Sequence, residues 1–228
     1  MNYCNPKWNN NGNLSKGDII KVVSDREFCT TLIDGVDSEF DVKQGEIHLI
    51  EEAQEGNDVI LLNPLNDDYL TSNTSRVLKV NPVKLNCSGS IYLENTATEG
   101  KGLRVIYGAF FDMNNLYGSR NNDTFLELRH CYSMSVNMKS SNNALSGLGY
   151  GVSIVGSNSL LNITGEALGC RHSVAFGGTS TEGGVAWDVH INNFTGSAKY
   201  DSQIFDTHYS CGRVHWNNCI GKGRIINT

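Results

Sequence analysis

Residues 103–216 repeat one short pattern in which a polar residue stands between two apolar ones: Leu103-Arg104-Val105, Leu126-Glu127-Leu128, Val152-Ser153-Ile154, Val189-His190-Ile191 and Val214-His215-Trp216. The polar middle residues are 23, 26, 37 and 25 positions apart. Successive side chains of a strand point to opposite faces, so each run places its apolar pair on one face and its middle residue on the other. One such strand per period is typical of a solenoid whose turns stack. The repeat therefore predicts a parallel β-helix, a fold suited to long polymeric ligands.

The sequence before the repeat contains strands without this period. Residues 17–23 and 45–50 are similar apolar runs, each introduced by glycine and an acidic residue, and residues 56–58 (Gly-Asn-Asp) form a strong turn signal. We therefore predict an all-β protein with three parts. These are a flexible arm over 1–13, a small β-rich domain over 14–82, and a right-handed, single-stranded parallel β-helix over 83–228.

Two features of the repeat predict details of its turns. Asn193 and Asn218 each follow a middle histidine by three positions, where stacked asparagines hydrogen-bond along the helix axis and tolerate left-handed backbone angles. The longest period contains a glycine-bounded segment over 177–184. Such an excursion is expected to project from one face, which is the usual location of function in repeat proteins.

Composition excludes several classes of partner. The net charge of −6 provides no basic patch for a phosphate backbone, so nucleic acid is not an expected partner. No segment approaches the roughly 18 apolar residues of a membrane span, and the N-terminus does not read as a signal peptide, so we expect synthesis in a cytoplasm without membrane insertion. The seven cysteines include no Cys-x-x-Cys pair, which favours free thiols in a core over a zinc or redox site. No cofactor is expected.

The strongest candidate for chemistry is Arg171-His172 together with Asp206-Thr207-His208. His172 and His208 are 36 positions apart, close to the 37 positions between Ser153 and His190, so we expect them on adjacent rungs. Asp206 and His208 are two positions apart and share one side of an extended strand. The catalytic candidates are therefore Asp206, His208 and His172, with Arg171 beside them.

This patch suits three kinds of chemistry, and the sequence leaves them open. A histidine and an aspartate can share acid–base work on a glycosidic bond. An arginine can neutralise a uronate while a histidine removes a proton. This is the chemistry of a polysaccharide lyase, for which calcium would be the cofactor. Two histidines and one carboxylate can also hold a metal ion. The structural alternative is that Asp206 caps a turn and the histidines are stacked rung residues.

The middle residues of the repeat form a second candidate surface. Arg104, Glu127, Ser153, His190 and His215 are expected to line one outward ladder, either as a sugar-binding surface or as a solvated strand face. Trp187 lies beside the long loop and is a better candidate for stacking on a sugar ring than the inward-facing Trp216. The substrate-binding candidates are Arg171, Trp187, His190 and His215.

The chain resembles the tail-spike and tail-fibre proteins of bacteriophages, which carry right-handed parallel β-helices of the pectate-lyase-like type. The resemblance rests on residues 16–18 to 64–65 with Tyr69 and 77–83, on residues 149–152 (Gly-Tyr-Gly-Val), and on residues 170–172 with 205–208. It implies a homotrimeric component of the phage tail that binds, and often cleaves, a bacterial surface polysaccharide and contacts other virion proteins. No catalytic motif of the family matches residue by residue.

The predicted function is therefore a phage tail-spike or tail-fibre component that recognises a surface glycan, with depolymerase activity left open. Two alternatives remain. One is a stand-alone polysaccharide lyase or glycoside hydrolase of the pectate-lyase-like type. The other is a structural virion segment without affinity for glycans.

Overall fold

The computed structural model describes residues 14–29, 32–33, 36–37, 42–54, 58–86, 88–95, 100–143, 149–177, 183–199, 202–207 and 211–223. The predicted arm over 1–13 lies outside these residues. Within them, every regular element is a strand except one short 3-10 helix, η1 (Thr71–Asn73). None of the described helices is long and apolar enough to cross a membrane.

The N-terminal strands form an antiparallel sheet in the order β5-β4-β1-β6. These strands are β1 (Ile19–Cys29), β4 (Val42–Ala53), β5 (Val59–Leu61) and β6 (Arg76–Val80), and a two-stranded hairpin adds β2 (Leu32–Ile33) and β3 (Val36–Asp37). The two similar runs in the sequence pair with each other, with Ile19 opposite Leu49 and Val23 opposite Gly45. Neighbouring residues Ile19 and Ile20 pack into different clusters, so both faces of the sheet bury apolar side chains.

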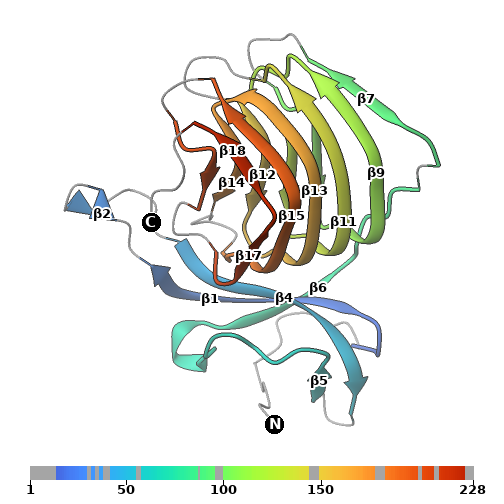
Figure 1. The fold of residues 1–228 in the computed structure, drawn as a ribbon. Helices are drawn as coiled ribbons and strands as arrows, with labels where there is room; N and C mark the ends of the chain where they lie inside the picture. The colour runs from blue at the N-terminus through green and yellow to red at the C-terminus, as the bar shows by residue number, and fades with distance from the viewer. Residues whose placement is uncertain are drawn as a thin grey trace.

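The solenoid consists of two parallel sheets whose strands stack as ribs (Figure 1). The five-stranded sheet contains β8 (Leu103–Ile106), β10 (Thr124–Arg129), β12 (Tyr150–Val155), β14 (His172–Gly177) and β16 (Phe205–Asp206). The seven-stranded sheet contains β7 (Ile91–Glu94), β9 (Ala109–Ser119), β11 (Tyr132–Ser141), β13 (Ser159–Cys170), β15 (Trp187–Ala198), β17 (Val214–Asn217) and β18 (Ile220–Lys222). One apolar core fills the space between the sheets, and the predicted parallel β-solenoid is confirmed.

The five alternating runs do not form a single ladder, and this part of the sequence interpretation is wrong. Glu127 lies opposite Arg104 and Ser153 in the five-stranded sheet, whereas His190 lies opposite Asn162 and His215 in the seven-stranded sheet. The step of 37 positions therefore joins two different sheets. Side chains alternate between the two faces in the strands of both sheets. The alternation in the sequence therefore cannot show which sheet a strand belongs to.

Asparagines stabilise the bends in the long strands, as the sequence predicted. Asn193 and Asn218 have left-handed backbone angles of φ 48° and 50°, and Asn218 Nδ2 donates to Asn193 Oδ1 at 2.7 Å. The preceding positions repeat the arrangement, because Asn217 Nδ2 donates to Asn192 Oδ1 at 2.8 Å. Each amide thus hydrogen-bonds its counterpart on the next rung.

Buried thiols contribute to the core, as the cysteine spacing predicted. Cys131 and Cys170 are free and fully buried, and burial raises the pKa of each thiol to about 12. A thiol with so high a pKa stays protonated at neutral pH and behaves as a small apolar side chain.

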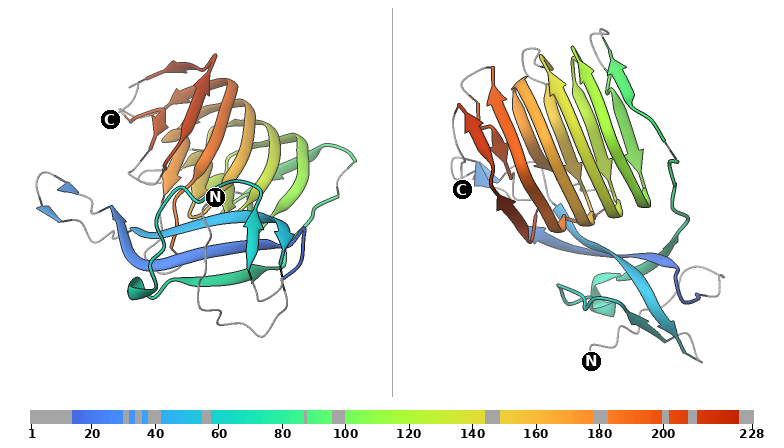
Figure 2. Two further views of the ribbon diagram at one scale, coloured as in Figure 1. Left: turned by 90° about the horizontal axis from the view of Figure 1, so that it is seen from below. Right: turned by 45° about the vertical axis from the view of Figure 1, so that its right-hand side comes forward.

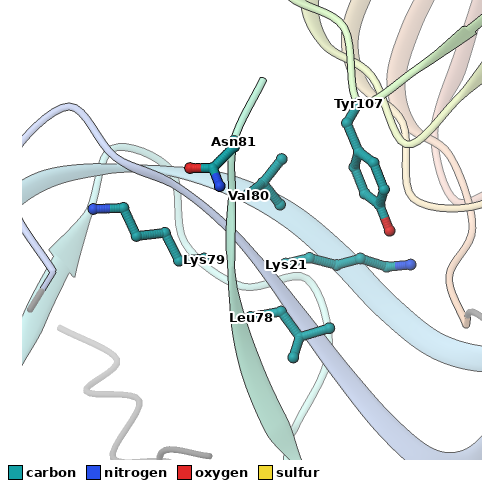
Figure 3. A pocket seen from close by; sticks show the side chains of 6 residues that line it. All are labelled: Lys21, Leu78, Lys79, Val80, Asn81 and Tyr107. Carbon is teal, nitrogen blue, oxygen red and sulfur yellow. The ribbon is translucent and has the colours of Figure 1, made fainter. Parts of the chain in front are cut away.

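The N-terminal sheet crosses beneath the solenoid and packs against one of its corners (Figures 1 and 2). Ile19 and Ile47 of the sheet contact Ala109 and Tyr132 of the solenoid in one buried cluster. Backbone hydrogen bonds also join the two parts, with the Gly184 N–H donating to the Lys43 carbonyl at 2.8 Å. Lys21 and Tyr107 meet at this junction (Figure 3). The sheet and the solenoid therefore share a buried interface.

Candidate functional site

The outward face of the five-stranded sheet carries a row of mostly polar residues. The flanking positions of each strand, such as Leu126 and Leu128, lie in the core, so the middle positions face away from it. In the order of the rungs, the row is Arg104, Glu127, Ser153, Ala175 and Asp206. Both ends of the row contain ionised groups.

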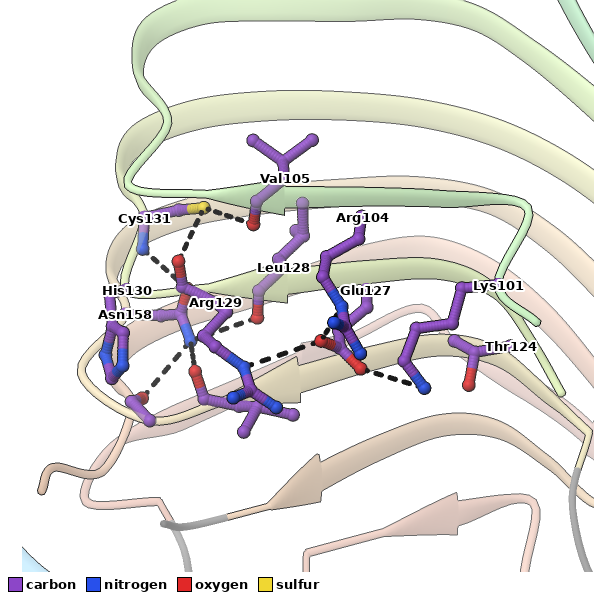
Figure 4. Close-up of polar contacts among 12 residues, drawn as sticks. Lys101, Arg104, Val105, Thr124, Glu127, Leu128, Arg129, His130, Cys131 and Asn158 are labelled. Carbon is purple, nitrogen blue, oxygen red and sulfur yellow. Dashed lines mark hydrogen bonds and ion pairs between the residues drawn. The ribbon is translucent and has the colours of Figure 1, made fainter. Parts of the chain in front are cut away.

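At the first end, Glu127 is surrounded by three cations (Figure 4). Its Oε1 is 2.7 Å from Arg104 Nε and 3.4 Å from Arg129 Nε, and its Oε2 is 3.1 Å from Lys101 Nζ. Lys101 Nζ also donates to Asp123 Oδ2 at 2.8 Å. One ammonium group thus holds two carboxylates side by side.

Cations outnumber carboxylates among the described residues of this cluster. Three cations and two carboxylates gather here, and a cavity of about 330 Å³ opens beside them, lined by Gly100, Lys101, Arg104 and Asp123. The Glu127 side chain is 4% exposed, whereas that of Arg104 is 45% exposed. Glu127 is therefore the buried anion that holds the cations in place. Arg104 exposes its guanidinium to solvent at the edge of the cavity.

At the other end of the row, the structure brings His172 and Asp206 together. His172 Nε2 lies 3.4 Å from Asp206 Oδ2, and both side chains are buried. The imidazole ring stacks on Tyr150, with centroids 5.3 Å apart. The rungs here are offset by 31 positions, since Val174 lies opposite Phe205, so the spacing of 36 used in the sequence argument does not describe this register.

The hydrogen bonds of His172 determine where its protons lie. The Gln203 carbonyl is 2.6 Å from Nδ1, and a carbonyl only accepts, so Nδ1 carries a proton. Nε2 then faces the Asp206 carboxylate, and protonation of Nε2 makes this contact a charge-assisted pair. Both side chains are buried, so this contact lies beneath the surface of the sheet.

The remaining predicted catalytic residues are less well defined. Arg171 lies half-buried between β13 and β14, and its backbone N–H donates to the Gly149 carbonyl at 2.7 Å. His208 lies outside the described residues. No group of three or more His, Cys, Asp or Glu side chains gathers as a metal site would within the described part of the chain.

The other predicted sugar contacts lie on the seven-stranded sheet. His190 and His215 stack on adjacent rungs, with centroids 4.4 Å apart and planes at 9°. Arg213 lies 5.3 Å from the centroid of the Trp187 ring, and Phe28 meets that ring edge-on at 6.0 Å. Trp187 therefore packs at the junction between the solenoid and the N-terminal sheet.

Arg213 connects this corner to the N-terminal domain. Its Nε and Nη2 donate to the two oxygens of Asp188 at 2.6 and 2.9 Å, and Nη2 also donates to Asn66 Oδ1 at 2.6 Å. The hydrogen bond from Arg213 is the main reason that the pKa of Asp188 is lowered, and the nearby charges of Arg213, His215 and His190 add to it. These residues hold two parts of the chain together.

The chain is similar to one protein family in sequence and to two phage tailspikes in structure. The family described as "Gp49, pectin lyase-like" matches residues 120–228. The Gp54 tailspike of Acinetobacter baumannii bacteriophage AP22, solved in complex with an A. baumannii capsular saccharide, superposes with a TM-score of 0.70 over 92% of this chain at 22% identity. The chain has the fold of phage tailspikes. The tailspike gp49 of Pseudomonas phage LKA1 also superposes, with a TM-score of 0.66 over 91% of this chain at 17% identity.

The tailspike resemblance predicted from the sequence is thus confirmed for the fold. The chain spans about a third of each tailspike, 34% in both cases. No curated protein matches the sequence.

Sequence reasoning missed the cluster around Glu127. Arg104 and Glu127 were assigned to adjacent rungs, and their opposite charges were a signal for an ion pair. Lys101 and Asp123 lie outside the alternating runs, and Lys101 reaches both Asp123 and Glu127 through the length of its side chain and the path of the preceding turn. That contact requires the three-dimensional register.

Proposed function

We propose that this chain is part of a phage tailspike in the virion and binds a bacterial surface polysaccharide on the outward face of its five-stranded sheet. The observation that carries the proposal is the cluster around Glu127, where three cations and two carboxylates of the described residues gather beside a cavity of about 330 Å³. The tailspike fold supports it, because a tailspike of this fold was solved with a capsular saccharide.

The cluster favours an anionic polysaccharide. Arg104 is anchored to Glu127 through Nε, which leaves its outer nitrogens for the carboxylate or hydroxyls of a sugar. Because Glu127 already fixes Arg104 and Lys101, binding costs little side-chain entropy. No cofactor is needed for this recognition.

A second candidate function is cleavage of the bound glycan. Asp123 and Glu127 share the Lys101 ammonium at 2.8 and 3.1 Å, and Asp123 lines the cavity while Glu127 lies buried behind Lys101 and Arg104. Most glycoside hydrolases use two neighbouring carboxyl groups as their catalytic groups. Release of new reducing ends from the bound polymer would support hydrolysis, and release of unsaturated ends would support a lyase.

Calorimetry of the full chain tests the binding proposal. We expect binding to those members of a panel of purified capsular polysaccharides that contain uronic acids, and weaker binding after their carboxyl groups are reduced. Arg104→Ala should weaken binding by at least about tenfold, because hydrogen bonds to charged groups contribute about 1.5–3 kcal/mol. EDTA should not alter the affinity.

Lys139→Ala is the matched control, since Lys139 is exposed on the other sheet. Equal affinities of Arg104→Ala, Lys139→Ala and the unaltered chain would move the glycan site away from this cluster. Absence of binding to every polysaccharide would favour a structural virion segment.

The proposed tailspike is a homotrimer. Light scattering of the purified chain should give three times the 25.0 kDa mass of one chain, and the trimer should persist in mild SDS. A monomer would mean that this chain does not trimerise on its own and that the residues around Glu127 bind glycan without a neighbouring subunit.

A further inference from the structure

An exposed tyrosine lies on the edge strand of the seven-stranded sheet, at the first rung of the solenoid. Tyr92 belongs to β7, which is the last strand in the order of this sheet and pairs with β9 (Figure 1). Its neighbours Ile91 and Leu93 pack against the core, so the Tyr92 side chain points outward. It is 65% exposed, the largest fraction among the exposed large hydrophobic side chains of the described residues. Most of this ring is therefore available to a ligand.

Hydrogen bonds hold the tyrosines of this edge in place. The Tyr92 hydroxyl lies 3.1 Å from Ser119 Oγ, within hydrogen-bond distance. On the next rung, Tyr117 lies opposite Tyr92, and its hydroxyl donates to Asn115 Oδ1 at 3.3 Å. Tyrosine has few rotatable bonds, and a ring whose hydroxyl is already bonded loses little freedom when a ligand covers it. The ends of β7 and β9 thus form a preorganised aromatic surface.

Polar groups border the aromatic surface. Glu94 is two positions after Tyr92 and shares its face of the strand. Its Oε1 lies 3.7 Å from Arg120 Nη1, and the two side chains are 41% and 72% exposed. One face of a sugar ring carries C–H groups that pack on an aromatic ring, while its hydroxyls need donors and acceptors at the edge. An aromatic ring bordered by exposed charged groups matches both requirements.

The aromatic surface is joined to the cavity of the proposed glycan site by two asparagines. Asn95 directly follows β7, and a Cβ atom added to Gly100, which lines the cavity, would lie 2.6 Å from Asn95 Nδ2. Asn121 is fully buried and donates to the Ser119 carbonyl at 3.2 Å. A Cβ atom added to Gly102 would lie 2.6 Å from Asn121 Oδ1. The end of β7 and the rim of the cavity are therefore in contact.

We propose that the polysaccharide bound in this cavity continues onto β7, where the Tyr92 ring stacks on a further sugar of the same chain. The inference rests on the proposed function. Tyr92 precedes Asn95 by three positions, which is about 10 Å in an extended strand. The ring therefore contacts a different sugar from the one that Arg104 holds. Arg104 selects for an acidic sugar, whereas Tyr92 selects for a chain long enough to reach β7.

Calorimetry of the full chain with fragments of one polysaccharide tests this inference. The probe is the uronic-acid-containing capsular polysaccharide that binds most tightly in the panel, cleaved by partial acid hydrolysis into fragments of graded length. We expect the affinity of the unaltered chain to rise with fragment length. Tyr92→Ala should bind the intact polymer about five- to tenfold more weakly, and its affinity for the shortest fragment that binds should be unchanged. Tyr92→Phe keeps the ring and should bind the polymer nearly as tightly as the unaltered chain.

Phe110→Ala is the matched control, because it removes an exposed aromatic ring near the opposite end of β9 and should leave the affinity unchanged. Equal affinities of Tyr92→Ala and the unaltered chain for the polymer, with Arg104→Ala still weakened, would overturn the inference and leave the proposed site in place. An equal loss for the shortest fragment and the polymer would also overturn it, since Tyr92 would then act within the cavity or on the fold. If Arg104→Ala weakens binding of no fragment, the proposed site and this inference both fail.

Discussion

Replacing Gly165 with alanine should destabilise the solenoid by about 3–5 kcal/mol, through a Gly-only backbone conformation and a steric overlap that cannot relax. Gly165 lies in β13 with φ +120°, a conformation that side chains rarely adopt. A Cβ atom there would lie 1.9 Å from the carbonyl oxygen of Met138. Met138 is the register partner of Gly165 in β11, so the obstacle is backbone within the sheet.

Thermal and guanidinium unfolding followed by circular dichroism measures this effect. Gly177→Ala is the matched control, because Gly177 also belongs to a solenoid strand, β14, but its added Cβ would meet only Val155 Cγ2 at 3.7 Å, an ordinary contact. We expect Gly177→Ala to unfold close to the unaltered chain. Equal midpoints for the two variants would mean that β13 can straighten at Gly165 without loss of pairing.

The sequence predicted the solenoid because its determinants are local. Alternating runs such as Leu126-Glu127-Leu128 indicate which side chains face the core. Asn193 and Asn218 indicate where the chain bends. What it did not predict is which sheet each run joins. Ser153 is followed on the next rung by Ala175, which breaks the polar pattern and hides the true partner.

The candidate site was predicted in part for the same reason. His172 and Asp206 were correctly grouped although their register offset was wrong, because they lie on paired neighbouring strands, β14 and β16. Lys101 and Asp123 were not found, since each comes from a turn whose path depends on the stacked strands. The roles of Asp206, His172, Arg171, Trp187, His190 and His215 in glycan binding stay predictions.

The second large effect is expected at the buried pair of His172 and Asp206. Asp206→Ala should destabilise the fold by about 3 kcal/mol, near the lower end for removing one partner of a buried ion pair. The side chains of His172 and Asp206 are only 3% and 9% exposed, so the imidazole left behind has little access to water. The loss should concentrate where β16 pairs with β14.

A double-mutant cycle separates this structural role from direct contact with a glycan. If the pair is coupled, His172→Gln should cost little more once Asp206 is alanine, with an interaction energy of about 1–3 kcal/mol. Asp206→Asn is the isosteric control that keeps the shape and removes the charge. Additive unfolding energies, combined with loss of polysaccharide binding in a folded Asp206→Ala variant, would instead make Asp206 a glycan contact. In that case the ligand must reach a side chain that the free chain buries, and the far end of the sheet would have to open when the polysaccharide binds.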